Sequence, residues 1–129
     1  MSGHAAEYDA VAQVVEEYFD GLYFSDTKRL RRVFHPLAQY VCVTDGTLLY
    51  RTMEEYFPVV NARPAPAQRG EARADRILSI EFAGPGLARA VLNCAIGDRF
   101  FTDWLTFVKL EGRWQVMSKI FHYETREAA

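Results

Sequence analysis

Three polar side chains interrupt an otherwise apolar pattern in the second half of the chain: Asp103, Ser118 and His122. An Asp that accepts a hydrogen bond from one imidazole nitrogen leaves the other nitrogen free to act as a base or an acid near neutral pH. Inside an apolar sheet, such groups cost free energy unless a partner satisfies them. They are therefore either a structural hydrogen-bonded pair or the chemical end of a ligand pocket, and both alternatives stay open.

The alternation of apolar and polar residues over 74–123 predicts four antiparallel strands that bring these side chains onto one face. A tight turn at 111–112 sets Ile120 opposite Asp103 and makes His122 the diagonal neighbour of that carboxylate, with side chains about 4–6 Å apart. A one-residue slip would invert every side chain that follows it. Because the two earlier turns continue the same apolar face, we expect no slip.

The opposite face of these strands carries large side chains that are too apolar to remain exposed together: Trp104, Met117, Phe121 and Tyr123. Aromatic residues with Met on a partly polar surface are typical of a protein–protein interface. We therefore expect a homodimer that forms through the outer face of the sheet.

The first half of the chain supplies helices that can cover the apolar face. Apolar residues at helical spacing predict an amphipathic helix over about residues 5–24. A second short helix begins at Ser25 or Asp26, which are good N-caps, and ends before Pro36. A capping box at 52–55 begins a third helix.

Shorter segments connect these helices to the sheet. Residues 38–44 and 47–51 predict a small hairpin, and Pro58 is expected to end or kink the third helix. The stretch 62–73 has no periodicity and is long enough to be mobile or to form a lid. The pattern as a whole predicts one α+β domain over residues 1–129, with a core at about 5–124.

Bulk composition narrows the classes of partner. With 129 residues, half of them apolar and 14% aromatic, the chain can build its own core and is not disordered. The 15 basic and 17 acidic residues are interspersed, which argues against a nucleic-acid partner, and no uncharged run is long enough to span a membrane.

The spacing of the cysteine and histidine residues predicts no metal site. The two cysteines, Cys42 and Cys94, lie apart in predicted strands, as reduced core thiols do. No histidines recur at metal-ligand spacing, and no Gly-rich phosphate loop is present, so we expect no metal and no cofactor. The first ten residues lack a secretory signal pattern, and we expect a cytoplasmic protein.

A family resemblance covers the chain from Tyr8 to Tyr123. The chain is similar to the nuclear transport factor two-like superfamily, also called SnoaL-like or ketosteroid-isomerase-like, and most similar to its lumazine-binding branch. The resemblance implies a cystatin-like cone, in which a curved antiparallel sheet is covered on its concave face by three helices. It also implies a pocket beneath the helices and dimers through the outer face. The motifs that carry it are Tyr18-Phe19-x-Gly21, Leu30-x-x-x-Phe34-His35-Pro36, Ile96-Gly97-Asp98-Arg99, Thr102-Asp103, Gly112-x-Trp114-x-Val116 and Lys119-Ile120-Phe121-His122.

The superfamily hosts enzymes and non-catalytic adaptors, so the resemblance does not name a reaction. The steroid isomerases carry their catalytic carboxylate at a position that falls near Cys42, which cannot serve as that base. Tyr18 lies in the region from which those enzymes supply a phenol to an oxyanion. The SnoaL-like cyclases and related dehydratases rely on His and Asp, which Asp103 and His122 match in type.

The leading hypothesis is a cofactor-independent acid/base enzyme, of isomerase, dehydratase or cyclase type, acting on a small apolar or aromatic metabolite. Asp103 and His122 are its expected acid/base pair, with Tyr18 as an oxyanion donor. The alternative is a ligand-binding or dimeric adaptor domain without turnover, and the sequence does not decide between them. The expected ligand-binding residues are Leu22, Tyr40, Phe101, Leu105, Trp114 and Ser118.

Overall fold

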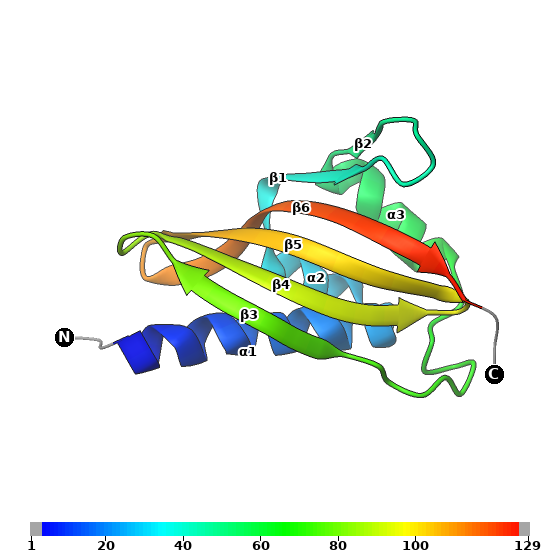
Figure 1. The fold of residues 1–129 in the computed structure, drawn as a ribbon, viewed down its shortest axis with the longest axis horizontal. Helices are drawn as coiled ribbons and strands as arrows, with labels where there is room; N and C mark the ends of the chain where they lie inside the picture. Colours follow the sequence, from blue (N-terminus) through cyan, green and yellow to red (C-terminus); the bar gives the residue numbers. More distant parts are fainter. Residues whose placement is uncertain (1–3, 127–129) are drawn as a thin grey trace.

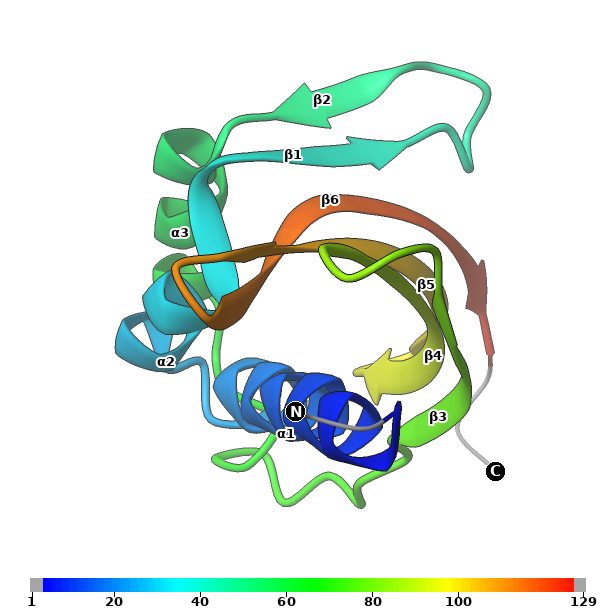
Figure 2. The same ribbon diagram turned by 90° about the vertical axis from the view of Figure 1, so that its left-hand side faces the viewer.

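The computed structural model describes residues 4–126 and has the predicted α+β architecture, with three helices and a six-stranded sheet in the order β2-β1-β6-β5-β4-β3 (Figure 1). Neighbouring strands are antiparallel except β1 and β6, which are parallel. The sheet curls around α1, as the view along that helix shows (Figure 2). The elements are α1 (His4–Tyr23), α2 (Thr27–Val33), β1 (Phe34–Cys42), β2 (Leu49–Arg51), α3 (Met53–Ala62), β3 (Arg76–Phe82), β4 (Leu87–Ile96), β5 (Arg99–Leu110) and β6 (Arg113–Thr125).

Local capping explains where the two later helices begin. The Asp26 carboxylate accepts from the backbone N–H groups of Lys28 and Arg29, at 3.1 and 3.2 Å, and begins α2. Thr52 and Glu55 form the expected capping box at the start of α3. Pro58 lies inside α3 without ending it, because the apolar face of this helix is buried against the sheet.

A bulge in β6 reverses the orientation of the second half of that strand. Phe107 pairs with Val116, but Thr106 pairs with Ser118, so Met117 is an extra residue on β6. The predicted register therefore holds from the turn to Val116 and is wrong beyond it. After the bulge, Lys119 and Phe121 point to the concave face, whereas Ile120 and His122 point outward.

The core lies between α1 and the concave face of the sheet. The buried face of α1 contributes Val11, Val15, Tyr18, Phe19 and Leu22. Strands β4 and β5 meet it with their alternate, inward residues. Polar side chains that lie on this concave face are thus enclosed by the helix.

The segment between α3 and β3 is tied to both sides of the cone. The Ala67 N–H donates to the Tyr23 carbonyl at 3.0 Å, and the Tyr23 hydroxyl donates to the Glu71 carbonyl at 2.7 Å. The Glu71 carboxylate accepts from the Gly97 N–H at 2.9 Å. That this segment forms a lid stays a prediction.

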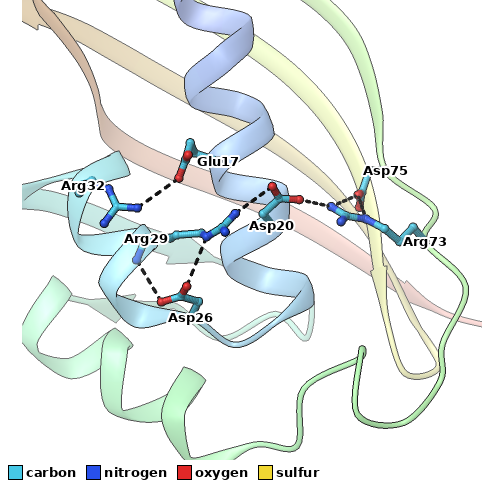
Figure 3. A network of polar contacts seen from close by, with 7 residues as sticks. All are labelled: Glu17, Asp20, Asp26, Arg29, Arg32, Arg73 and Asp75. Carbon is cyan, nitrogen blue, oxygen red and sulfur yellow. Dashed lines mark hydrogen bonds and ion pairs between the residues drawn. The ribbon is translucent and has the colours of Figure 1, made fainter.

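An ion-pair network holds the same segment to α1 and α2 (Figure 3). The Arg73 guanidinium lies 2.9 Å from Asp20 on α1 and 2.8 Å from Asp75, and Arg29 on α2 lies 3.0 Å from the same Asp20. The side chains of Asp20, Arg29 and Arg73 are about one-third exposed, so each pair contributes little alone. Together they fix the end of α1 relative to its neighbours.

Candidate functional site

A buried carboxylate lies at the centre of the covered face. Asp103 is fully buried on β5, and the Tyr18 hydroxyl of α1 donates to its Oδ2 at 2.5 Å. The Cys94 thiol, a weak donor, lies 3.9 Å from the same oxygen. Among the described residues, Asp103 Oδ1 has no hydrogen-bond partner. One oxygen of this carboxylate is therefore held in place, while the other is buried without a described partner.

A buried ammonium faces the same region. Lys119 is only 4% exposed, because the bulge at Met117 turns its side chain inward. Its Nζ lies between 4.9 and 5.4 Å from four ring centroids, those of Tyr18, Tyr40, Tyr56 and Phe121. Aromatic faces at this distance stabilise a cation, and the effect grows when the cation is removed from water.

The electrostatics keep the phenol protonated and the amine charged. Burial, reinforced by the neighbouring Asp103 carboxylate, raises the pKa of Tyr18 well above its ordinary value. Burial alone would lower the pKa of Lys119, but the surrounding Tyr56, Asp103 and Tyr40 more than offset it, so the pKa is raised. Tyr18 is thus a hydrogen-bond donor at neutral pH, and Lys119 is an ammonium.

A small cavity lies over Lys119. Its volume is about 10 Å³, room for about one water molecule. Its wall combines two cations, two phenols and one thiol with three apolar side chains. The lining residues are Leu22, Tyr40, Tyr56, Arg63, Cys94, Ile96, Phe101 and Lys119. A cavity of this size holds no metabolite unless lining side chains move, so the expected ligand pocket stays a prediction.

The expected pair of Asp103 with His122 does not form. His122 pairs with Thr102 on the outer face, and its Nδ1 lies 3.0 Å from the Thr44 hydroxyl. Ser118, which pairs with Thr106, also points outward. The prediction that these side chains share the apolar face was wrong, because the bulge shifts the alternation by one residue.

The other predicted site residues divide into two groups. Leu22, Tyr40 and Phe101 line the cavity. Leu105 is buried on the same face but does not line it, and Trp114 lies at the far end of the sheet, where its Nε1 donates to Glu7 at 2.7 Å.

Sequence reasoning missed Lys119 and Arg63. The predicted register placed Lys119 on the outer face, next to Phe121 and Tyr123. A signal was available, because that register put both of those large aromatic side chains on the outer face, where only a partner chain could bury them. A one-residue bulge buries Phe121 and brings Lys119 in with it.

Residues 4–126 contain no group of three or more His, Cys, Asp or Glu side chains arranged to hold a metal ion. Within the same residues, none of the helices combines the length and the apolar character needed to cross a membrane.

Solved structures share this fold. An NTF2-like protein of unknown function from Shewanella baltica superposes with a TM-score of 0.86 at 27% identity, covering 96% of this chain and 98% of that one. A ketosteroid isomerase-like protein from Erwinia carotovora atroseptica superposes with a TM-score of 0.71 at 8% identity, covering 91% and 95%. The predicted nuclear transport factor two-like fold is confirmed.

Within that superfamily, the chain belongs to the family described as "Putative lumazine-binding", whose sequence profile matches residues 6–122. Aldolase FrzH from Cladobotryum sp. is 28% identical over 118 residues, which are 92% of this chain and 92% of that protein. The similarity thus extends over nearly the whole length of both chains.

Proposed function

We propose that this chain is a cofactor-independent enzyme that removes a proton from carbon beside a carbonyl group of a small organic molecule. The observation that carries the proposal is the fully buried Asp103, whose Oδ2 accepts from Tyr18 at 2.5 Å while its Oδ1 is unpartnered. A carboxylate held in this way has a fixed orientation and a free lone pair, which a general base needs.

Each member of the site has a distinct part in this step. Asp103 Oδ1 accepts the proton, and the electrons of the broken C–H bond move into the carbonyl to give an enolate. The Lys119 ammonium stabilises the enolate oxygen, as a charge fixed in a dry site can. Tyr18, predicted as an oxyanion donor, instead orients the carboxylate, because its proton is directed at Asp103.

One enolate intermediate serves several outcomes. In a substrate whose enolate is conjugated with a second double bond, return of the proton from Asp103 at the far end of the conjugated system isomerises the substrate. Alternatively, the enolate carbon attacks a second carbonyl and forms a carbon–carbon bond, and the resulting alkoxide takes up the proton that Asp103 holds. The second outcome is an aldol reaction, the activity named for the relative FrzH. Of the isomerase, dehydratase and cyclase types that the family resemblance implied, the proposal fits the isomerase and cyclase types, and it adds the aldolase type.

Deuterium exchange tests the proposal without knowledge of the natural substrate. The protein is incubated in D₂O with small ketones and 2-oxo acids, and uptake beside the carbonyl is followed by NMR. We expect exchange above the buffer rate, reduced by a factor of about 10² or more in Asp103→Asn. Asp98→Asn, an exposed carboxylate in a turn, is the matched control and retains the exchange. Equal rates in the two variants would contradict the role of Asp103.

The nearly closed cavity favours a second candidate, a ligand-binding or adaptor domain without turnover. A volume of about 10 Å³ leaves no room for a metabolite unless the side chains around Lys119 rearrange. Binding of a ketone or 2-oxo acid without any deuterium uptake would favour this candidate over the enzyme.

We also propose that the chain forms a homodimer through the outer face of its sheet. An apolar row crosses four strands there: Val41 pairs with Ile120, Ile120 with Trp104, and Trp104 with Val91. Trp104 and Ile120 are 55% and 52% exposed, and exposed apolar side chains that form a contiguous patch mark an interaction surface. Phe121, which we expected in this interface, is buried on the inner face instead.

Light scattering at micromolar concentration tests the dimer. We expect twice the chain mass for the wild type and a single chain mass for Trp104→Arg, because a charge in the middle of the apolar row would have to be desolvated. Leu37→Arg is the control: Leu37 is 77% exposed and lies outside the row. A wild-type monomer would refute the interface.

A reducing compartment agrees with the state of the thiols. Cys42 and Cys94 are both buried and free. Their burial supports the proposed cytoplasmic location, in which structural thiols remain reduced.

A further inference from the structure

We infer that the ligand of the Lys119 cavity carries a carboxylate, and that Arg63 is the residue that selects it. The inference deepens the proposed function and rests on it for the site, since it narrows the substrate from a carbonyl compound to an oxo acid. Arg63 follows α3 directly, at the start of the segment that crosses the end of the cone.

The charge of the cavity wall is the first observation. Two of its eight lining residues, Arg63 and Lys119, are cations, and no described carboxylate lines the wall beside them. This local excess of positive charge contrasts with the chain as a whole, which is acidic, with a net charge of −2. Because the neighbouring Asp103 carboxylate can offset only one of the two charges, the excess positive charge of this wall favours an anionic ligand.

Unsatisfied polar atoms are the second observation. Two of the buried side-chain atoms without a described hydrogen-bond partner belong to residues that line this cavity: Arg63 Nε and the Tyr56 hydroxyl oxygen. Buried polar atoms are nearly always hydrogen-bonded, so each exception calls for a reason. A carboxylate beside Arg63 and Tyr56 supplies the acceptors that their N–H and O–H groups lack.

Lys119 and Arg63 both affect the pKa values of the same two residues, Tyr40 and Cys94. Burial raises the pKa of Tyr40, and both Lys119 and Arg63 oppose that rise, as they do for the Cys94 thiol. Because both cations line the same small cavity, one small ligand can contact both of them, with its carboxylate at Arg63 and its reacting oxygen at Lys119. Planar guanidinium groups bind carboxylates in a bidentate manner, which an ammonium cannot do.

The apolar residues of the cavity wall indicate the chemical character of the rest of the ligand. Leu22, Ile96 and Phe101 are apolar and lie on α1, β4 and β5. Together with the cations they fit an oxo acid with a small apolar side chain, in which the carbonyl and the carboxylate are near neighbours.

Two ligands that differ only in the carboxylate measure the contribution of this group to binding. 4-Methyl-2-oxopentanoate and 4-methyl-2-pentanone share the ketone and the isobutyl group and differ in carboxylate against methyl. Affinity is measured by calorimetry, and deuterium uptake at the shared methylene is measured by NMR in the same samples. The variants are Arg63→Met and Arg76→Met, the latter an exposed arginine on the outer side of β3.

We expect the wild type and Arg76→Met to bind the oxo acid at least about tenfold more tightly than the ketone, and Arg63→Met to lose this preference. An unchanged preference in Arg63→Met, a wild type that prefers the ketone, or no binding of the oxo acid at millimolar concentration would overturn the inference. Selective binding without deuterium uptake leaves the inference standing and refutes the enzymatic proposal. Equal exchange of both probes refutes the inference and leaves the enzymatic proposal standing.

Discussion

Replacing Tyr18 with Phe tests whether Asp103 depends on the phenol. The substitution keeps the ring, which is fully buried, and removes only the hydroxyl that donates to Asp103 at 2.5 Å. The carboxylate then retains only the weak thiol contact at 3.9 Å, since its other oxygen has no described partner. Hydrogen bonds to charged groups contribute about 1.5–3 kcal/mol, and an orphaned buried acceptor costs more, so we expect a loss of about 3 kcal/mol.

Urea denaturation measures that loss directly. With a slope of about 2 kcal/mol per molar, typical of a domain of this size, the midpoint should fall by about 1.5 M. Tyr8→Phe is the control, because Tyr8 lies on the same helix but is 44% exposed, and we expect a change below about 0.5 kcal/mol. In the double variant with Asp103→Asn, the losses should be smaller than their sum. A Tyr18→Phe midpoint equal to that of Tyr8→Phe would refute the reasoning.

Two further outcomes follow from burial. Burial raises the pKa of Tyr18 above its ordinary 10.0 and that of Cys94 above 9.0, so the folded chain retains protons that the unfolded chain releases. Stability should therefore be full below about pH 9 and fall at higher pH, with a shallower fall in Tyr18→Phe, as urea titrations at pH 7–10.5 can measure. Gly21→Ala would place a Cβ 2.5 Å from Cδ2 of the buried Leu30, so overpacking should exceed the gain in helix propensity and destabilise by about 1 kcal/mol in thermal melts. A more stable Gly21→Ala protein would contradict this clash.

Local signals in the sequence were sufficient for most of the fold. The capping box at 52–55 and the N-cap at Asp26 begin helices as expected, because each depends on side chains only a few residues apart. The pairing of β4 with β5 follows the turn at 97–98 and places Leu92 opposite Asp103, as predicted. These features are fixed by short-range geometry, which a sequence displays directly.

Which side chains of β6 face the site depends on the extra residue at Met117, and the geometry of the turn does not determine that bulge. Asp103 was placed correctly because β5 has no bulge relative to β4. The partner strand carries its bulge at Met117, and tertiary packing selects it by burying Phe121 in place of Ile120. Lys119 therefore points to the face that carries Asp103, and the predicted partner His122 points to the opposite face. Arg63 could not be found from strand periodicity at all, because it lies outside the sheet.

Stability alone does not account for the ammonium of Lys119. Removing such a group from water costs several kcal/mol, and four cation–π contacts with a carboxylate nearby roughly offset that cost. An apolar side chain of similar length would fill the same space without any such cost, so the packing gains nothing from the charge. This balance supports the proposal that the charge acts on a ligand. An ammonium and a hydrogen-bonded carboxylate on the same covered face of the sheet suit the removal of a proton from carbon, which is the chemistry proposed for this site.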